Sequence, residues 1–468
     1  MPTLKIYTKA PAGENYPLSL SGSIHFAFQE DSSTYQELNS GYGILFAQAT
    51  IREDNTIDAR TLRNPRIYQS GQSYLIFADE CREDGTPILD GNVILFRTSD
   101  FITFESQQKV PAVDYEDELA QSTDEITLSP ETLASVKERW LPQHSEEAEA
   151  PIFPMAIGFA DPVVFQQDGY WYFLATNDNV DDVGLFIRRA ASVKGLFEKD
   201  VEMKCILDYD EHRELMQTFW APEFHRIGED YYILFAVSGK TWAPQCHMMK
   251  LKRGGDIMRS EDWEDPVRVR KMDGSYLTED GISLDMTYFK IENVSYLVWS
   301  YRFGIGTPAD TGSMLYIATT DEKKPWILTS EPVLLSRPLF GWENTTGTIN
   351  NEGPYPLLLE DRIYLAYSGG AACGYSYAIG YLSASLRDNL LQPESWYKEP
   401  SPVLRSTFIE GIEGPGHNSF FYDEKGRLMV AYHAQETKQY HKRCTTMHPV
   451  HIGKNGFPFL NVTPVSDH

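Results

Sequence analysis

The most regular feature of the chain is a recurring pair of short apolar runs that are joined by a polar turn. One copy consists of Asp161-Pro-Val-Val-Phe, the turn Gln-Asp-Gly, and the aromatic run that begins at Tyr170. Two such runs with a Gly- or Asp-bearing turn between them predict a β-hairpin. Helical periodicity is scarce in these segments, so the pattern favours an all-β chain.

The same pair of runs returns along the sequence. Its later copies begin with Trp220-Ala-Pro-Glu-Phe-His, Leu284-Asp-Met-Thr-Tyr-Phe, Asn351-Glu-Gly-Pro-Tyr-Pro and Gly414-Pro-Gly-His-Asn-Ser-Phe. Successive copies lie roughly 60 to 67 residues apart, a period that is typical of a β-propeller with one four-stranded blade per repeat. We therefore predict a five-bladed β-propeller over residues 151–468.

Residues 1–150 are predicted to form a separate N-terminal extension. A weaker copy of the repeat around Asn64 and Tyr74 indicates either a partial blade or an additional sheet. Residues 110–150 are acidic and break the pattern, and within them Ser129 and Pro130 fit the N-cap and first position of a short helix. We expect this insert at the surface, either as a lid or as a solvated loop.

Charge and cysteine usage narrow the function classes. The formal net charge of −26 disfavours nucleic acid and anionic membranes as partners, and no apolar run is long enough to span a bilayer. The five cysteines are scattered without a C-x-x-C pair, so we expect neither a disulfide frame nor a zinc site. The N-terminus also lacks a basic start followed by an apolar stretch, which predicts a cytoplasmic protein unless a leader has been removed. The oligomeric state stays open.

Three of the repeats open on a carboxylate, namely Asp161, Asp285 and Glu352. Because the first strand of each blade lines the central channel, we expect these side chains to converge. Glycoside hydrolysis with inversion needs one carboxyl group to protonate the leaving oxygen and another, roughly 6.5 to 9.5 Å away, to activate water. A third carboxylate beside the acid would raise its pKa. Each acid alone fits a turn residue, but their shared phase in the repeat favours a common site.

Taken in order, the motifs Asp-Pro, Trp-Ala-Pro-Glu, Leu-Asp-Met, Glu-Gly-Pro-Tyr and Gly-Pro-Gly-His-Asn-Ser resemble glycoside hydrolase family 43 over roughly residues 155–460. The resemblance implies a five-bladed propeller and an inverting enzyme. It implies that Asp161 is the general base, Glu352 the general acid, and Asp285 the neighbour that orients the acid and raises its pKa. Arg443 resembles an arginine of the family that would hold Glu352 or Asp285 by a charge-assisted hydrogen bond. Met follows Asp285 where the family commonly has Pro, and the first 150 residues match poorly.

Further residues receive smaller roles. His417 resembles a channel histidine that lies beside a calcium ion or its waters, so a structural calcium is expected near it, although the chemistry requires no cofactor. Trp220 fits either a platform under the sugar or packing between blades. Glu223 fits either a substrate contact or a brace for the neighbouring blade. His433 fits either a sugar ligand or a hydrogen-bonded core residue.

The predicted function is exo-acting hydrolysis that releases a terminal pentose, α-L-arabinofuranose, from plant-type oligosaccharides, as the resemblance implies. β-D-Xylosidase is the nearest alternative, followed by another propeller glycosidase such as a galactosidase or a fructosidase. The alternative from a different class is a non-catalytic carbohydrate-binding propeller, against which the presence of all three carboxylates argues. The expected partner is a small oligosaccharide.

Overall fold

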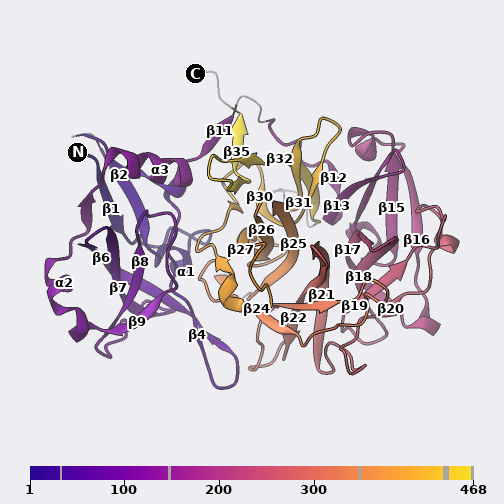
Figure 1. Ribbon diagram of the computed structural model, residues 1–468, viewed down its shortest axis with the longest axis horizontal. Coiled ribbons are helices and arrows are strands. Elements are labelled where there is room, and N and C mark those ends of the chain that lie inside the picture. Colours follow the sequence, from indigo (N-terminus) through magenta and orange to yellow (C-terminus); the bar gives the residue numbers. More distant parts are fainter. Residues whose placement is uncertain (32–33, 146–148, 346–348, 436–441, 465–468) are drawn as a thin grey trace. The chain divides into compact units, whose positions relative to one another are not determined.

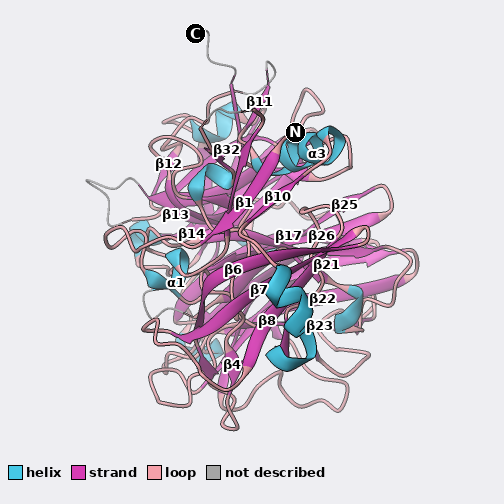
Figure 2. Ribbon diagram, turned by 90° about the vertical axis from the view of Figure 1, so that its left-hand side faces the viewer, coloured by secondary structure: helices cyan, strands magenta, loops and turns pink. Residues whose placement is uncertain are grey.

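The computed structural model describes residues 1–31, 34–145, 149–345, 349–435 and 442–464 (Figure 1). The chain forms two compact units, of which one comprises residues 1–144 and 339–347 and the other residues 145–338 and 348–468. Strands outnumber helices in both, which confirms the predicted β class (Figure 2). The predicted domain boundary at residue 150 stays a prediction. In the described part of the chain, no helix has the length and hydropathy that crossing a membrane requires.

The second unit is built from antiparallel sheets whose strands mostly follow one another along the chain. The first sheet contains β13 (Phe159–Gln167), β14 (Tyr170–Asn177), β15 (Leu185–Ala190) and β16 (Glu202–Leu207). The second contains β17 (Gln217–Ile227), β18 (Asp230–Ser238), β19 (Gln245–Lys250) and β20 (Val267–Arg268). The third contains β21 (Gly281–Ile291), β22 (Val294–Phe303), β23 (Met314–Thr320) and β24 (Val333–Ser336).

Two further sheets complete this unit. One contains β25 (Asn351–Leu359), β26 (Arg362–Gly369), β27 (Ala378–Ser385), β28 (Tyr397–Lys398) and β29 (Leu404–Arg405). The other contains β30 (Glu413–Tyr422), β31 (Leu428–Gln435), β32 (Cys444–Pro449) and, at its edge, β12 (Ala156–Ile157). Because β12 precedes the first sheet in sequence but pairs with the last one, it ties the two ends of the unit together. The short strands are β11 (Gln143–Ser145), β33 (His451–Ile452), β34 (Pro458–Phe459) and β35 (Val462–Pro464).

The first strands of the five sheets contact one another in a closed cycle. Strand β13 contacts β17 and β30, β21 contacts β17 and β25, and β25 contacts β30. Apolar clusters fill the spaces between neighbouring sheets, as where Leu174 of β14 joins the cluster that holds Phe235 of β18. Across the seam between the last and first sheets, Met429 of β31 shares a cluster with Phe173 of β14. The cycle brings the beginnings of the five first strands around one centre.

The hairpin turns follow from local sequence. Between β13 and β14 the loop consists of Asp168 and Gly169, whose φ angles are 50° and 81°. Two successive left-handed residues define a type I′ turn, whose twist matches that of the paired strands. Asp and Gly tolerate this conformation, so the predicted hairpin forms at the turn that the sequence indicated.

Each first strand carries a β-bulge near its beginning. The strand register shifts there, and one residue of each bulge has a left-handed φ of 47° to 57°. These residues are Asp161, Ala221, Asp285, Gly353 and His417. A left-handed conformation costs a non-glycine residue about 1 to 3 kcal/mol and persists where surrounding contacts enforce it. Such strain is common at functional sites, because a bulge redirects side chains.

Hydrogen bonds from the neighbouring sheet hold these bulges. The backbone N–H of Ala221 donates to Oγ1 of Thr176 on β14 at 2.8 Å. The backbone N–H of His417 donates to Oγ of Ser368 on β26 at 2.7 Å. In both cases a hydroxyl near the end of a second strand satisfies a bulge amide of the next sheet. The bulge positions are therefore fixed between sheets rather than within one sheet.

The first unit contains two four-stranded antiparallel sheets. One holds β1 (Thr3–Tyr7), β2 (His25–Gln29), β3 (Gln36–Glu37) and β10 (Glu125–Thr127); the other holds β6 (Arg60–Ser70), β7 (Ser73–Arg82), β8 (Asn92–Thr98) and β9 (Gln108–Pro111). A short hairpin joins β4 (Thr50–Ile51) and β5 (Ile57–Asp58), and the α-helices are α1 (Leu18–Ser21), α2 (Glu116–Gln121) and α3 (Pro130–Trp140). The 3₁₀ turns of the two units include Asn39–Gly41, Ala112–Tyr115, Asp178–Val180, Lys194–Phe197, Glu211–Arg213, Ser260–Asp262 and Pro393–Ser395.

Strand β6 reproduces the local structure of the repeat. Asn64 has a left-handed φ of 49° at a register shift against β7, and its side-chain amide donates to Asp79 at 2.8 Å. The weak sequence copy around Asn64 therefore forms the same kind of bulged first strand as the copies in the second unit.

The helix predicted in the acidic insert is confirmed. Ser129 caps α3 by accepting the backbone N–H of Thr132 at 3.1 Å, and Pro130 is its first residue. The interpretation as a solvated loop is wrong for α3, which buries Leu133 and Trp140 in the core of the first unit. It fits α2, which has no buried residue. Apolar residues at helical spacing explain the difference, since an acidic segment can still present one apolar face.

Candidate active site

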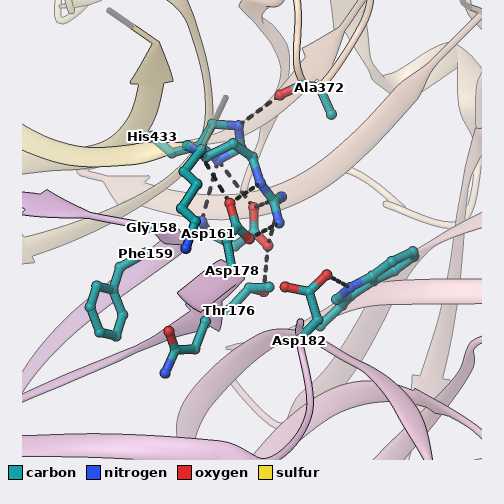
Figure 3. Close-up of polar contacts among 12 residues, drawn as sticks. Gly158, Phe159, Asp161, Thr176, Asp178, Asp182, Ala372 and His433 are labelled. Carbon is teal, nitrogen blue, oxygen red and sulfur yellow. Dashed lines mark hydrogen bonds and ion pairs between the residues drawn. The ribbon is translucent and has the colours of Figure 1, made fainter. Parts of the chain in front are cut away.

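Asp161 lies at the bulge of β13 and is 4% exposed. Figure 3 shows Thr176 and His433 beside its carboxylate. The hydroxyl of Thr176 donates to Oδ2 at 2.6 Å, Nδ1 of His417 lies 3.2 Å from Oδ1, and Nη1 of Arg443 lies 3.3 Å from Oδ1. Burial alone would raise the pKa of Asp161, but His417 and Arg443 outweigh it and hold the pKa well below its usual value. Asp161 is therefore ionised.

His433 contacts Asp161 through one ring nitrogen. Its Nε2 lies 3.2 Å from the carbonyl oxygen of Ala372. Its Nδ1 lies 3.3 Å from the backbone nitrogen of Asp161 and 3.1 Å from Oδ1 of the same residue. Burial lowers the pKa of His433, and the carboxylate of Asp161 opposes this effect. The ring is fully buried and stacks on Tyr377. These contacts favour the core-residue interpretation of His433 over a sugar ligand.

Arg443 pairs with acids other than the two that the sequence predicted. Its Nη2 donates to Oδ1 of Asp178 at 2.7 Å and its Nε to Oδ2 at 3.2 Å, while Nη1 faces Asp161. The predicted bond to Glu352 or Asp285 is wrong. Pairing of β12 with β32 explains this, because the backbone N–H of Gly158 bonds to the carbonyl of Arg443 and places the side chain next to β13. Asp178 thus orients the guanidinium that keeps Asp161 ionised.

Glu352 lies near the beginning of β25, where the hydroxyl of Tyr377 donates to its Oε1 at 3.0 Å. Burial, and then the negative charge of Asp285, raises the pKa of Glu352 to about 7. The structure therefore keeps one acid, Asp161, ionised and another, Glu352, protonated up to neutral pH. Two carboxyl groups whose environments separate their pKa values are suited to the roles of base and acid.

Asp285 occupies the bulge of β21 and is also 4% exposed. Its Oδ2 accepts the backbone N–H of Gly353 at 3.1 Å and the hydroxyl of Ser300 at 3.3 Å. Burial raises the pKa of Asp285, and Asp161 adds to this effect. The hydrogen bond to Gly353 fixes Asp285 against the residue that directly follows Glu352.

The prediction that the three acids occupy the same position of the repeat is correct for Asp161 and Asp285. Asp161 and Asp285 are bulge residues, whereas Gly353 is the bulge residue of β25 and Glu352 precedes it. The glycine at this bulge is required by space, because a Cβ on Gly353 would lie 2.9 Å from the ring of His417. Glu352 consequently approaches the centre from one residue earlier than the repeat predicts.

His417 lies among the acids. Burial lowers its pKa, but Asp161, Asp285 and Glu352 outweigh burial and raise the pKa above its usual value. The imidazolium therefore balances part of their negative charge. The site combines an ionised acid, a protonated acid and a cation within one buried cluster.

For Trp220 the sequence left two alternatives, a platform under the sugar and packing between blades. Its indole N–H donates to Oδ2 of Asp182 at 2.8 Å, and its ring packs beside Ile282 and Leu284 of the next sheet. It also meets the exposed Trp242 edge to face, with ring centroids 6.2 Å apart. Burial raises the pKa of Asp182 to about 6. These contacts favour packing between sheets for Trp220.

Glu223 is buried and bonds to its neighbour on the same face of β17. Its Oε2 lies 2.6 Å from Nε2 of His225. The ring of His225 contacts Tyr288 of β21 and Tyr355 of β25. The pair therefore joins three first strands, which favours the bracing role that the sequence suggested. Substrate contacts of Trp220, Glu223, His433 and Arg443 stay predictions.

Residues 148–458 match the sequence profile of glycosyl hydrolases family 43. The chain belongs to this family. The match contains all three acids, Arg443 and His417, and it confirms the resemblance that the repeat motifs indicated.

Individual proteins resemble the chain over about two thirds of its length. An extracellular exo-α-(1→5)-L-arabinofuranosidase of Streptomyces avermitilis is 31% identical over 67% of this chain and 63% of its own length. An enzyme of the same name from Streptomyces chartreusis is 32% identical over 61% of this chain and 83% of its own. The crystal structure of an α-L-arabinofuranosidase from Lactobacillus brevis is 29% identical, with a TM-score of 0.58 over 68% of this chain and 98% of that one. The chain thus spans less than two thirds of the first relative.

The predicted cytoplasmic location is wrong on this comparison, because both Streptomyces relatives are named extracellular. The prediction depended on the N-terminus, which lacks a basic start followed by an apolar stretch, and on the unpaired cysteines. All five are free in the structure, and Cys81, Cys246 and Cys444 are buried. Buried thiols behave as small apolar side chains and need no reducing compartment, so their number carries no information about location.

Sequence reasoning missed residues that shape this family 43 site, above all Asp178 and Tyr377. Asp178 directly follows the aromatic strand β14, in a polar Asn-Asp-Asn segment. Loop polarity of that kind is common, and nothing in the sequence indicated that Arg443, 265 residues later, would bind it. The sequence did hold a signal for Ser300 and Ser368 as site residues, because both lie at corresponding places in the repeat. Ser300 is one residue from the end of its aromatic run, and Ser368 is the last residue of its own.

The charge of Asp285 sets the alkaline limit of the expected activity. If Glu352 is the general acid, as the sequence predicts, loss of kcat/KM as pH rises reports its deprotonation, since burial and Asp285 raise its pKa to about 7. Asp285→Asn removes a negative charge beside it, so the pKa of Glu352 falls and the alkaline limb should move to lower pH by roughly one unit. Ser300→Ala is the control, since it removes a hydrogen bond to Asp285 and keeps its charge. If the alkaline limbs of the two pH profiles coincide in the wild type and Asp285→Asn, Asp285 does not raise the pKa of Glu352.

Proposed function

We propose that this family 43 protein is an inverting exo-α-L-arabinofuranosidase that releases terminal arabinofuranose from plant-type oligosaccharides. The observation that carries the proposal is the opposite protonation of two acids near His417. The pKa of Asp161 lies well below its usual value, and that of Glu352 is raised to about 7. The names of the two Streptomyces relatives and of the Lactobacillus brevis structure support the choice of sugar and of exo action.

The proposed reaction is a single displacement at the anomeric carbon. Asp161 accepts a proton from water while the water oxygen bonds to the anomeric carbon from the face opposite the leaving group. The bond from that carbon to the leaving oxygen breaks, and Glu352 gives its proton to this oxygen. The products are the free sugar with inverted configuration and an alcohol. Exchange with solvent then returns the proton from Asp161 to Glu352.

The electrostatic surroundings suit these two tasks. Arg443 and His417 stabilise the charge of Asp161, so this side chain is ready to accept a proton at any pH above the acidic range. The negative charge of Asp285 raises the pKa of Glu352, so this side chain keeps the proton that it has to give. We assign Asp178 a positioning role, because it holds Arg443. Among the described residues, Asp178 forms no hydrogen bond with Asp285 or Glu352.

The fold that we propose for the second unit is a five-bladed β-propeller. Its support is the closed cycle of first strands β13, β17, β21, β25 and β30, together with the edge strand β12 that joins the last sheet to the start of the unit. We propose residues 151–468 as the catalytic domain, with the β6–β9 sheet of residues 1–150 as a blade-like addition, supported by the bulge at Asn64.

A calcium ion near His417 stays a prediction. Among the described residues, no group of three or more His, Cys, Asp or Glu side chains could hold a metal ion. Calcium prefers six to eight oxygen ligands, which this donor set does not fit by direct coordination. The proposed reaction uses side chains of the chain alone.

The proposal is tested by the sugar that is released and by its first-formed anomer. We expect the purified protein to hydrolyse nitrophenyl α-L-arabinofuranoside well ahead of the β-D-xylopyranoside. Proton NMR during the first turnovers should show β-L-arabinofuranose, the inverted product. A retained anomer would overturn the mechanism, preference for the xyloside would favour β-xylosidase, and absence of turnover on the whole panel would favour a binding propeller.

A further inference from the structure

A cavity of about 640 Å³ lies beside β19, β20 and the beginning of β21 in the second unit. Its lining includes the cations Arg213, Lys240, Arg268 and Arg270, against the acids Glu214 and Glu279. Arg213 forms ion pairs with Asp210 and Asp265 and adds little free charge. Lys240, Arg268 and Arg270 still outnumber the two lining acids, in a chain with a net charge of −26. A concave surface with a local charge of this sign attracts anions, although the protein as a whole repels them.

The floor of the cavity is preorganised. The guanidinium of Arg268 lies over the ring of Tyr276, 3.6 Å from its centroid, and its Nη2 donates to Oε1 of Gln245 and to the carbonyl of Thr278. Oε1 of Gln245 also accepts the hydroxyl of Ser283 at 3.0 Å. These contacts fix the plane of Arg268 and use only one of its nitrogen atoms.

A second guanidinium meets the same tyrosine. Arg270 lies 4.5 Å from the centroid of Tyr276, and its Nη2 donates to the hydroxyl of that residue. Within the described ranges, neither Arg268 nor Arg270 forms an ion pair with a carboxylate, and the ammonium group of Lys240 has no hydrogen bond. Burial lowers the pKa of Arg268, which shows that its charge is partly withdrawn from water. Glu279 offsets part of the charge of Arg268, whereas Arg270 and Lys240 have no carboxylate ion pair among the described residues. Cations of this kind favour binding of an external anion.

The cavity and the proposed active site lie at the same end of the strands. Gly281 of the cavity wall begins β21, and Asp285 follows four residues later, roughly 13 Å along the strand. The loop from Gly239 to Ala243, which also lines the cavity, carries Trp242. This ring is 45% exposed and contacts Trp220. A saccharide chain that extends from the acids across Trp242 would therefore reach the cavity.

We propose that this cavity binds the carboxylate of a uronic acid residue in the saccharide chain that carries the scissile arabinose. The proposal rests on the proposed function, because it assigns the substrate class of the same site. Arg268 and Arg270 both lie against Tyr276, and a single guanidinium can offer a pair of parallel N–H donors that match the two oxygens of a carboxylate. The exposed Trp242 offers an apolar face to a neutral sugar between the two sites.

The experiment measures binding without turnover. Full-length protein with Glu352→Gln is titrated calorimetrically with trigalacturonic acid and with its methyl ester, which has the same sugars without the charge. We expect the acid to bind at least tenfold more tightly than the ester, and Arg270→Gln to remove about tenfold or more of that difference, as for a charge-assisted hydrogen bond. Rising salt should weaken binding of the acid alone.

Matched variants separate the cavity from general charge effects. Arg226→Gln removes an exposed arginine near the other end of β17 and should leave binding of the acid unchanged. Lys240→Gln is the second cavity variant and guards against misfolding of the first, because Lys240 lies on an exposed loop. Equal binding of acid and ester, or equal losses in Arg226→Gln and Arg270→Gln, would overturn the proposal. So would inorganic phosphate that displaces the trisaccharide at equal concentration, since the cavity would then bind any small anion.

The result is independent of the proposed function. Turnover of nitrophenyl arabinofuranoside, a neutral substrate without a uronic acid, measures the proposed function of the wild type separately from the cavity. A normal rate on this substrate without binding of the uronate would overturn the cavity assignment alone. Binding of the uronate by a protein that hydrolyses no arabinoside would overturn the proposed function and leave the anion site.

Discussion

Replacing Glu352 by Gln should lower kcat/KM on arabino-oligosaccharides by about 10²- to 10⁴-fold, the range that removal of a general acid produces. Gln keeps the volume of the side chain and can still meet the hydroxyl of Tyr377, but it has no proton to give to the leaving oxygen. The loss should depend on the leaving group. A sugar alcohol needs the proton, whereas nitrophenolate departs without it, so the nitrophenyl arabinoside should lose far less activity than the oligosaccharide.

The matched control is Tyr377→Phe, which removes the hydrogen bond to Glu352 and keeps its proton. Its rates on both substrates should fall by a similar and smaller factor. The pH profile gives a second measurement, because the alkaline limb near pH 7 should vanish in Glu352→Gln. Equal losses on nitrophenyl and sugar leaving groups, or a surviving limb, would assign the acid to another residue.

Much of the second unit could be predicted because its determinants are local. Hairpin turns such as Asp168-Gly169 and the aromatic runs that follow them repeat in sequence, and each repeat forms its own sheet. The sequence could not predict that Glu352 lies one residue before the bulge rather than at it. A bulge shifts register by one residue, and only the packing of Gly353 against His417 determines which residue takes the left-handed conformation.

The partners of Arg443 depend on tertiary structure. The sequence correctly indicated an arginine near the acids, but its side chain turns towards Asp161 and Asp178 because β32 pairs with β12, more than 280 residues earlier in the chain. The acidic insert shows the same limit. Its charge predicted a surface segment, whereas Leu133, Val136 and Trp140 of α3 share one apolar face that the first unit buries. Composition describes the exposed side of such a helix and misses the other.

Asp161→Asn should lower kcat by about 10²- to 10⁴-fold on every arabinoside, whatever the leaving group. The amide cannot accept the proton of the attacking water, and that step is common to all substrates. Steady-state rates on the nitrophenyl arabinoside and on an arabino-oligosaccharide check the claim. Calorimetric binding of arabino-oligosaccharide to the variant shows whether the site is still folded, since Arg443 keeps its pairing with Asp178.

Thr176→Val is the matched control for Asp161, because it removes the 2.6 Å hydrogen bond to Oδ2 and leaves the carboxylate in place. It also removes the acceptor of the Ala221 N–H, so thermal unfolding of the variant is measured beside its rates. Weaker stabilisation of the ionised form raises the pKa of Asp161, so the acid limb of kcat/KM should move to higher pH while the rate near neutrality changes little. Uniform loss in Asp161→Asn and selective loss in Glu352→Gln together identify a base and an acid, because only protonation of the leaving oxygen depends on what leaves. If Asp161→Asn spares the nitrophenyl substrate as well, Asp161 does not activate water and the attacking water is deprotonated by another group.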